Sequence, residues 1–254
     1  MSIAIHRKGS GPPLVLLHCL GVDHRLWDIA AAGLERDFTL IGYDFPGHGE
    51  SPLPGSGYGI AELSAALAEV FAHEGIGRAH LGGISLGGLV AQHFAATHPE
   101  LVDRLMLLDT TPRYTDEMRR MWVVRAEQAR KQGVASLLDS LLPVWFTPGF
   151  IATDPPAVRY VRDCFHRDSG EGYALACEAL RAADLRELVP RIEAPTLVVC
   201  GDEESQAFRD AAAFLAANIP SATSLTLSPA RHASVLEQPE AFVAAAREFL
   251  LSRP

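Results

Sequence analysis

Short apolar runs alternate along the chain with longer stretches in which apolar residues recur at helical spacing. The apolar runs predict six strands, at residues 14–17, 39–43, 78–84, 105–108, 196–200 and 224–227. The helical patterns between and after them cover residues 60–73, 86–97, 208–217 and 239–251. Continuous apolar strands that alternate with helices are typical of a parallel sheet covered on both faces. We therefore expect an α/β fold with a doubly wound, mostly parallel sheet.

One long segment interrupts this alternation. Residues 111–192 contain no strand-like run, but they contain four helical patterns, at 117–132, 134–142, 156–165 and 172–183. A loop of this length without structure of its own is uncommon in a compact domain. We expect a core domain made of residues 1–111 and 193–254, with a helical cap, residues 112–192, inserted over one edge of the sheet.

Composition narrows the class of protein and of partner. With 48% hydrophobic and 21% charged residues, the 254-residue chain has the composition of a globular protein. Its 31 acidic and 22 basic residues give a net charge of −9, which argues against nucleic acid and anionic membranes as partners. The N-terminal residues lack the apolar region of a signal peptide, and no apolar run approaches the length of a membrane helix. We expect a soluble, cytoplasmic protein whose partner is a small molecule.

Residues that bind metals or cofactors form no recognisable motif. The four cysteines, Cys19, Cys164, Cys177 and Cys200, are scattered and include no C-x-x-C pair. Their expected role is that of small buried apolar residues. The sequence also lacks an H-E-x-x-H motif, a Cys/His cluster and a glycine-rich phosphate loop. We expect no metal, nucleotide or other cofactor.

The segment Gly83-Ile84-Ser85-Leu86-Gly87 has the spacing G-x-S-x-G, directly after a predicted strand and at the start of a predicted helix. In that context the serine sits on a strained turn, and side chains in place of the flanking glycines would collide with neighbouring backbone. The helix points its positive end at the site, which favours a developing oxyanion. Ser85 is therefore the candidate nucleophile, and a structural glycine turn is the alternative.

A serine nucleophile needs a base, and the chain contains ten histidines. His73, His93 and His98 lie on predicted helices or at their ends, where a surface role is expected. His232 instead follows the last predicted strand in a short loop. It therefore lies at the carboxyl edge of the sheet, where open α/β folds place their sites, and it is the candidate base. The chain order serine, acid, histidine then places the acid in the loop Gly201-Asp202-Glu203-Glu204-Ser205.

Over its full length the sequence resembles the α/β-hydrolases, and among them it is most similar to the 3-oxoadipate enol-lactonases of aromatic catabolism. The elbow and the stretch Gly47-His48-Gly49 are common to many α/β-hydrolases, whereas the cap stretches are more specific to the lactonase group. The resemblance is carried by residues 43–51 (YDFPGHGES), 83–87 (GISLG), 142–147 (LPVWFT), 171–173 (EGY), 182–186 (AADLR) and 236–242 (LEQPEAF).

The resemblance indicates which carboxylate serves as the acid. Relatives carry it three residues after the glycine that ends the strand, most often as Asp, and here that position is Glu204. Asp202 is the alternative, and we expect its side chain to point away from His232 or to brace the loop. If neither residue acts, Asp109 at the end of another predicted strand is the next candidate.

The resemblance also implies an oxyanion hole made of two backbone N–H groups, those of Leu86 and Leu20. Many relatives have His-Gly before the oxyanion loop, whereas this chain has His18-Cys19. His18 and His48 are expected to have structural roles in the loops near the elbow. Trp27 is expected to pack beside the oxyanion loop, and a place in the wall of the pocket is the alternative.

Cap residues are the candidate substrate-binding groups. Lactonase relatives tend to carry Arg directly before the Trp of L-P-x-W-F-T, and this chain has Val144 there. An anionic substrate needs a cationic partner, which we expect Arg125 to supply, with Trp145 and Trp122 beside it in the pocket. In the alternative interpretation the aromatic residues form the core of the cap and the arginines are solvated.

Taken together, the resemblance implies a cofactor-free serine hydrolase that cleaves an ester or lactone of a small substrate, including carboxylated ones, through an acyl-enzyme. A broad-specificity carboxylesterase, a C–C bond hydrolase and a cofactor-free haloperoxidase share the same triad and remain alternatives. A receptor without catalytic activity on the same fold is an alternative from a different functional class.

Overall fold

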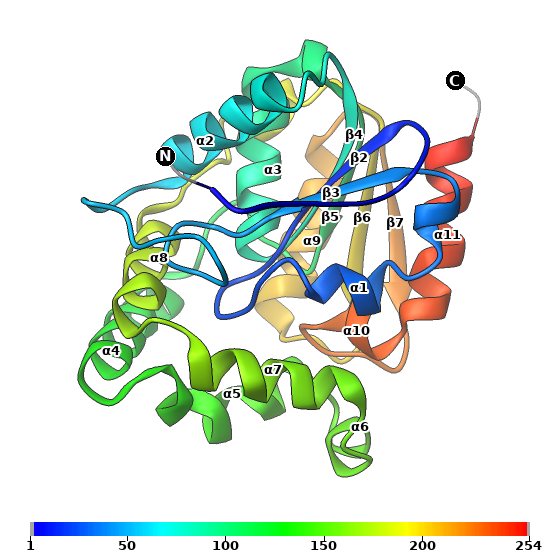
Figure 1. Cartoon of the computed structure of the whole chain (residues 1–254). Helices are drawn as coiled ribbons and strands as arrows, with labels where there is room; N and C mark the ends of the chain where they lie inside the picture. The colour runs from blue at the N-terminus through cyan, green and yellow to red at the C-terminus, as the bar shows by residue number, and fades with distance from the viewer. Residues whose placement is uncertain (1–2, 253–254) are drawn as a thin grey trace.

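A seven-stranded sheet forms the centre of the molecule in the computed structural model, which describes residues 3–252 (Figure 1). Its strands are β1 (Ile5–Gly9), β2 (Pro13–Leu17), β3 (Thr39–Tyr43), β4 (Ala79–Ile84), β5 (Val102–Leu108), β6 (Thr196–Gly201) and β7 (Ala222–Leu227). Their spatial order is β1-β3-β2-β4-β5-β6-β7, and all neighbours are parallel except β1 and β3. The prediction of a mostly parallel sheet is confirmed.

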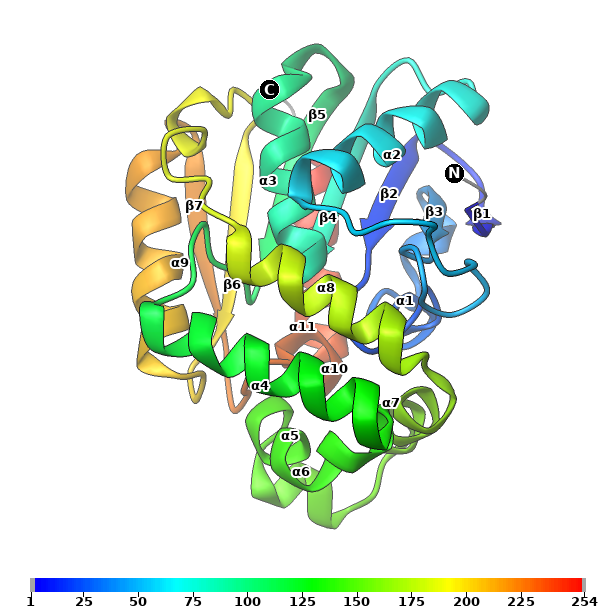
Figure 2. The same ribbon diagram turned by 90° about the vertical axis from the view of Figure 1, so that its left-hand side faces the viewer.

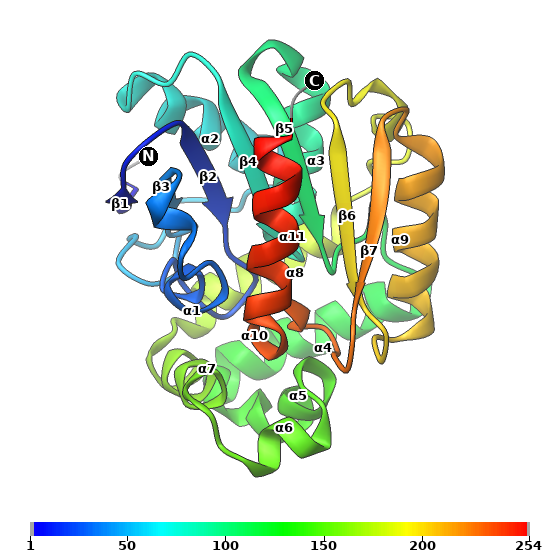
Figure 3. The same cartoon turned by 90° about the vertical axis from the view of Figure 1, so that its right-hand side faces the viewer.

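Helices cover both faces of this sheet. The helices outside the long insertion are α1 (Leu26–Ala30), α2 (Ile60–His73), α3 (Leu86–Thr97), α9 (Gln206–Asn218), α10 (Ser234–Glu237) and α11 (Pro239–Leu251). α2 and α3 lie on one face and α1 and α11 on the other (Figures 2 and 3). The helix α9 packs against β6 and β7. Because both faces are covered, the central strand β4 is buried at every position.

The segment between β5 and β6 forms a helical cap over the carboxyl ends of the strands. Its helices are α4 (Asp116–Gln132), α5 (Leu138–Trp145), α6 (Pro148–Ala152), α7 (Pro156–Arg167) and α8 (Gly170–Ala182). Short 3₁₀ turns lie here and elsewhere, at Leu34–Arg36, Pro99–Leu101, Val134–Leu137 and Val189–Arg191. The strands run towards these cap helices, and α4 packs along α8 (Figure 3). The expected helical insertion is therefore present.

Local sequence explains why the longest cap helix, α4, begins and ends where it does. The side chain of Thr115 accepts a hydrogen bond from the N–H of Met118, which satisfies one of the free N–H groups of the first turn. Acidic residues occupy that first turn and basic residues the last, as the helix dipole favours. Gly133 ends the helix with a φ of 80°, a conformation that a side chain would disfavour. No helix among residues 3–252 is both long enough and apolar enough to cross a membrane.

Four elements are absent from the sequence-based expectation. The strand β1 is an exposed edge strand with the sequence IHRKG, so it shows no apolar run. The helices α1, α6 and α10 have only four or five residues each, too few to show a helical period. The expectation for the cysteines is confirmed, because all four are free and buried.

Candidate active site

Ser85 lies on a strained turn between β4 and α3. Its backbone has a φ of 52° and a ψ of −110°, a combination that residues with a side chain rarely adopt. A Cβ atom on Gly83 would overlap the carbonyl oxygen of Gly87, and one on Gly87 would overlap those of Leu17 and His18. The reason given for the two glycines is therefore confirmed: the turn has no room for side chains beside the serine.

Hydrogen bonds from β5 and the residues that follow it hold this turn in place. The N–H of Ser85 donates to the carbonyl of Leu108 at 2.9 Å. The hydroxyl of Thr110 donates to the carbonyl of Ser85 at 2.8 Å. Strain at one residue persists only where its surroundings over-determine it, and here the neighbouring strand does so.

His232 lies in the loop after β7, and Glu204 holds its ring from one side. His232 Nδ1 is 2.5 Å from Glu204 Oε2, and both side chains are buried. An ionised carboxylate has no proton to donate, so in this hydrogen bond Glu204 is the acceptor and His232 Nδ1 carries the proton. His232 Nε2 then keeps a free lone pair. Burial alone would lower the pKa of His232, but the charge of Glu204, its hydrogen bond and the charge of Asp109 together outweigh burial and raise that pKa above its ordinary value.

The two other candidate carboxylates have different partners. Asp202 accepts hydrogen bonds from the hydroxyl of Ser228 at 2.5 Å and from the N–H of Ala230 at 2.9 Å. It therefore braces the loop, as expected. Asp109 is buried and accepts from the hydroxyl of Ser234 at 2.5 Å. Burial and the nearby charge of Glu204 raise the pKa of Asp109 to about 7. Of the three carboxylates, Glu204 is the one that bonds to His232.

Ser85 and His232 line one cavity, together with Glu204. No hydrogen bond joins Ser85 to His232, although both belong to the part of the chain that the structure describes. Such bonds are often long in free enzymes and tighten when substrate binds. The serine, the imidazole and the carboxylate thus face the same cavity, and a catalytic triad of the three stays a prediction.

The expected oxyanion hole concerns Leu20 and Leu86. Among the described residues, neither of their N–H groups donates a hydrogen bond. His18 stabilises the loop that carries Leu20: its Nδ1–H donates to the carbonyl of Cys19 at 2.7 Å, and its Nε2 accepts from the N–H of Phe45 at 2.9 Å. Burial lowers the pKa of His18, so the ring is neutral and structural. The oxyanion role of Leu20 and Leu86 stays a prediction.

The active-site cavity has a volume of about 250 Å³ and lies between the sheet and the cap. Trp122 and Arg125 reach it from α4, and Trp145 reaches it from α5, so all three predicted substrate-binding residues line it. Its wall also contains Cys19, Leu20 and Val144, which the sequence singled out for other reasons, and four residues to which the sequence analysis assigned no role: Met118, Met121, Tyr173 and Phe208. Apolar spacing on these helices is equally typical of core residues, so only the fold distinguishes the two roles.

Arg125 is the cation of this cavity. Its guanidinium lies 4.9 Å from the centre of the Trp122 ring, and one nitrogen contacts the sulfur of Met121 at 3.8 Å. Within the described residues it forms no ion pair with a carboxylate. Another cap arginine, Arg162 on α7, instead pairs with Asp154. Trp27, for its part, packs outside the active-site cavity, as expected.

A buried glutamate that the sequence analysis assigned no role, Glu237, connects the cap to the histidine loop. Its Oε1 accepts from the N–H and the hydroxyl of Thr147, at 2.9 and 2.7 Å. Its Oε2 accepts from the N–H of Arg231 at 2.7 Å. The N–H of Ala233 also donates to the carbonyl of Trp145 at 2.9 Å. The residues on both sides of His232 are therefore bonded to the segment that forms the cavity wall.

Comparisons with known proteins identify the family. The family model described as alpha/beta hydrolase fold matches residues 12–141. The 3-oxoadipate enol-lactonase 2 of Acinetobacter baylyi is 32% identical over 242 residues, which cover 95% of this chain and 90% of that protein. The chain belongs to the α/β-hydrolase fold family. The resemblance inferred from the sequence is confirmed.

Solved structures of other α/β-hydrolases match the whole chain, cap included. The enol-lactonase from Burkholderia xenovorans LB400 has a TM-score of 0.93 and 34% identity, and the match covers 98% of this chain and 96% of that one. A thermophilic esterase from Thermogutta terrifontis, solved with malate bound, has a TM-score of 0.91 and 27% identity over 98% of this chain and 92% of that one. This α/β-hydrolase is thus similar to enzymes that act on lactones and on esters.

The role of Glu237 leads to a stability prediction. We expect Glu237→Gln to lower the free energy of unfolding by about 1–3 kcal/mol, since the amide cannot accept all three hydrogen bonds and leaves a buried donor unpaired. Urea denaturation measures the change. Glu240→Gln is the matched control, because Glu240 is exposed in the first turn of the next helix, and it should lower the stability by less than about 1 kcal/mol, the size of a helix-dipole effect. Equal stabilities of the two variants would contradict the assigned role.

Proposed function

We propose that this α/β-hydrolase cleaves an ester or lactone bond of a small, negatively charged substrate through an acyl-enzyme on Ser85. The observation that carries the proposal is the shared cavity of three groups: a serine on a strained turn, a buried imidazole, and a carboxylate bonded to that imidazole. The same three groups act together in serine hydrolases on several unrelated folds.

In the first half of the reaction, His232 Nε2 accepts the proton of the Ser85 hydroxyl while the serine oxygen attacks the substrate carbonyl. The negative charge then develops on the carbonyl oxygen, for which the N–H groups of Leu86 and Leu20 are the proposed donors. Glu204 keeps the proton of His232 on Nδ1 and stabilises the imidazolium. When the tetrahedral intermediate collapses, His232 returns its proton to the leaving alkoxide.

In the second half, water replaces the alcohol. His232 accepts a proton from the water, whose oxygen attacks the acyl-serine, and the collapse of the second intermediate releases the acid and restores the Ser85 hydroxyl. With a lactone, the alcohol formed in the first half stays tethered to the acyl group. One turnover then yields a single hydroxy acid, or a keto acid where the released alcohol is an enol that tautomerises.

Two observations support a small anionic substrate. The cavity of about 250 Å³ lies just below the range of about 300–1,000 Å³ that is typical of small-molecule sites. Its wall is mainly apolar, and the guanidinium of Arg125 makes no ion pair with another described residue. A cation left unpaired in an apolar cavity is a partner for a substrate carboxylate. The similarity to enol-lactonases, and to an esterase with malate bound, agrees with this class of substrate.

We further propose that residues 112–192 act as a separate cap domain that selects the substrate, while the core formed by residues 1–111 and 193–254 performs the chemistry. Arg125, Trp122 and Trp145 belong to the cap, and Ser85 and His232 to the core. The four free cysteines favour a reducing, cytoplasmic location.

The nucleophile can be tested by covalent labelling. A fluorophosphonate should add one label to the wild-type protein at Ser85, and Ser85→Ala should abolish both the label and the hydrolysis of small lactones and p-nitrophenyl esters. Intact-mass and peptide mass spectrometry locate the label. Ser205→Ala is the control, because Ser205 lines the same cavity and should leave labelling intact. A label that survives in Ser85→Ala would refute the mechanism, and a wild-type protein with neither label nor turnover would favour the receptor alternative.

The acid is tested by comparing two neighbouring carboxylates. Glu204→Gln should lower kcat by about 10⁴-fold, the loss typical of a triad acid, with little change in KM or Tm. Asp202→Asn should cost less than about tenfold, or 1.4 kcal/mol of barrier, since the amide can keep the contacts with Ser228 and Ala230. The reverse ranking would assign the acid to Asp202. An unchanged rate in both variants would leave Asp109 as the candidate acid.

Glu204→Gln should also change the pH dependence of kcat/KM. Neutral His232 is the active form, and its pKa is raised above the ordinary value of about 6.5. As the pH is lowered, activity should therefore be lost with a midpoint above pH 6.5. Removing the charge of Glu204 lowers that pKa, so the residual activity of Glu204→Gln should persist to lower pH. A pH profile of kcat/KM that does not move would contradict the contact between the two side chains.

The role of Arg125 is tested with paired substrates. Arg125→Ala should raise KM about 10- to 100-fold for a carboxylated lactone or ester, because a charge-assisted hydrogen bond is lost. For a neutral ester of the same size, KM should rise much less. Arg162→Ala is the control in the same cap, since Arg162 already pairs with Asp154. Equal effects of Arg125→Ala on both substrates would show a structural role.

A further inference from the structure

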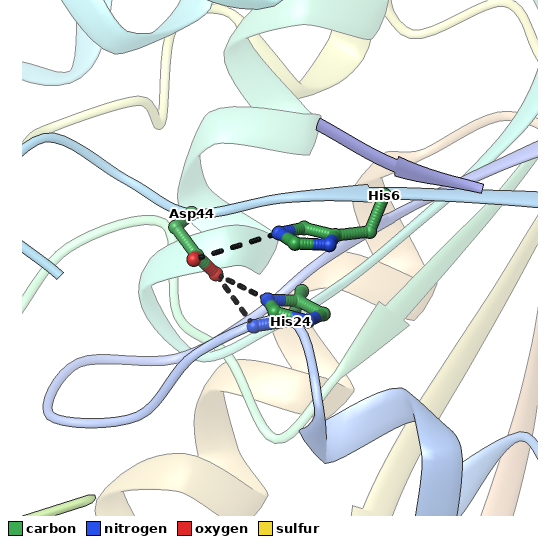
Figure 4. Close-up of side chains that lie close together, drawn as sticks. All are labelled: His6, His24 and Asp44. Atoms are coloured by element: carbon green, nitrogen blue, oxygen red, sulfur yellow. Dashed lines mark hydrogen bonds and ion pairs between the residues drawn. The ribbon is translucent and has the colours of Figure 1, made fainter. Parts of the chain in front are cut away.

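Two histidines and an aspartate form a cluster at the edge of the sheet, outside the active-site cavity (Figure 4). His6 belongs to β1, His24 precedes α1, and Asp44 follows β3. One ring nitrogen from each histidine and one carboxylate oxygen lie within 4.8 Å of one another. Figure 4 shows that a nitrogen of each ring is directed to the carboxylate. The cluster therefore brings together donor atoms from three segments of the chain.

Asp44 is the fixed anion of this cluster. Its side chain is fully buried, and its oxygens accept from the N–H groups of His24 and Glu50, both at 2.8 Å. Burial alone would raise the pKa of Asp44, but the hydrogen bond with His24 and the other hydrogen bonds hold it far below its usual range. The carboxylate is therefore ionised and oriented.

The two imidazoles differ in how they meet this anion. His24 Nδ1 lies 2.9 Å from Asp44 Oδ1 and forms a hydrogen bond. His6 Nε2 lies 3.9 Å from Asp44 Oδ2 and 3.8 Å from Glu50 Oε2, too far for a hydrogen bond. That nitrogen atom is shielded from solvent, yet it has no hydrogen-bond partner among the described residues. A ring nitrogen that is shielded from solvent and lacks a partner beside two carboxylates is a position for an ordered water or a metal ion.

The surroundings leave room for an ion to enter. A cleft of about 240 Å³ opens beside both histidines. The two basic residues that line it are each paired with a carboxylate: Arg7 with Glu74 at 3.0 Å and Lys8 with Asp28 at 3.6 Å. Their positive charges are thus offset locally, and the ionised Asp44 dominates the field at the two rings.

We propose that His6, His24 and Asp44 bind a divalent transition-metal ion, of which Zn²⁺ fits best. Two imidazole nitrogens and one carboxylate are a donor set that binds Zn²⁺ and leaves a further position for water. Donors on a tetrahedral Zn²⁺ ion lie about 3.3 Å apart. The two separations between a ring nitrogen and an Asp44 oxygen, 2.9 and 3.9 Å, bracket that value.

Binding requires one change in the cluster. The rings are stacked, with centroids 3.3 Å apart and planes at 8°, so the lone pairs of their nitrogens run side by side instead of converging. One ring must turn about its Cβ–Cγ bond, a torsion with broad minima. His6 can do so, because its side chain is 31% exposed on an edge strand. Glu50, with 71% of its side chain exposed, can approach as a fourth ligand.

The bound ion would join the edge strand β1 to the segments around His24 and Asp44. Its affinity should fall as the pH falls, because the metal replaces the proton on His24 Nδ1. The site is independent of the proposed hydrolytic mechanism, and its test does not rely on turnover.

Titration of the full, chelator-treated chain tests the site. Calorimetry with Zn²⁺ should show one ion bound per chain, Tm should rise with Zn²⁺ but not with Mg²⁺, and Co²⁺ should give visible ligand-field bands. His6→Gln and His24→Gln should each weaken Zn²⁺ binding by at least about tenfold and remove the Co²⁺ bands. His166→Gln, at an exposed histidine of the cap, should behave like wild type.

The metal-free Tm of each variant serves as the folding control. His6→Gln changes a partly exposed residue of the edge strand, so it decides the question even if His24→Gln is unstable. An absence of Zn²⁺ binding to the wild type would overturn the proposal. So would equal binding by the wild type and a folded His6→Gln variant, since the ion would then sit elsewhere on the surface.

Discussion

The close approach of three backbone segments around Ser85 is the constraint on which the rest of the structure depends. The end of β2, the turn after β4 and the start of α3 meet where Gly83 and Gly87 leave no space for a Cβ atom. The strained conformation of Ser85, which costs on the order of 1–3 kcal/mol, is held because β4 pairs with a strand on either side. The serine therefore stands at the carboxyl edge without a flexible loop to carry it.

A second close approach governs the other half of the site. A Cβ atom on Gly201, the last residue of β6, would overlap the carbonyl oxygens of Ala230 and Arg231. The glycine lets the end of β6 lie directly against the histidine loop, and Asp202 then fastens the two by bonding to Ser228 and Ala230. With the turn fixed in this way, the side chain of residue 204, two residues after Asp202, must span the remaining gap to His232. Glutamate, with one methylene more than aspartate, does so with a bond of 2.5 Å.

The sequence predicts these features to the extent that they are local. The elbow, the limits of α2, α3 and α11, and the positions of the six strands β2 to β7 follow from apolar periodicity and glycine spacing, because each depends on residues close together in the chain. Glu204 came from the resemblance, since spacing alone leaves Asp202 equally placed. Glu237 and the cluster of His6, His24 and Asp44 could not be predicted: their partners are distant in sequence, and single polar residues carry no period.

The net charge of the chain and the charge inside the cavity have opposite effects on an anionic substrate. The chain carries a net charge of −9, which disfavours anions in general, but solvent screens charges farther apart than a Debye length of about 8 Å. The electrostatic energy of a bound substrate is therefore set mainly by the charged groups nearest to it, and Arg125 is a cation that lines the cavity itself. On the proposed mechanism, hydrolysis creates a second carboxylate beside Ser85, in a cavity that Glu204 also lines. The arginine can neutralise one carboxylate but not both. On this proposal the second carboxylate is left without a guanidinium or ammonium partner in a cavity that Glu204 also lines, and the repulsion between the two carboxylates favours release of the product.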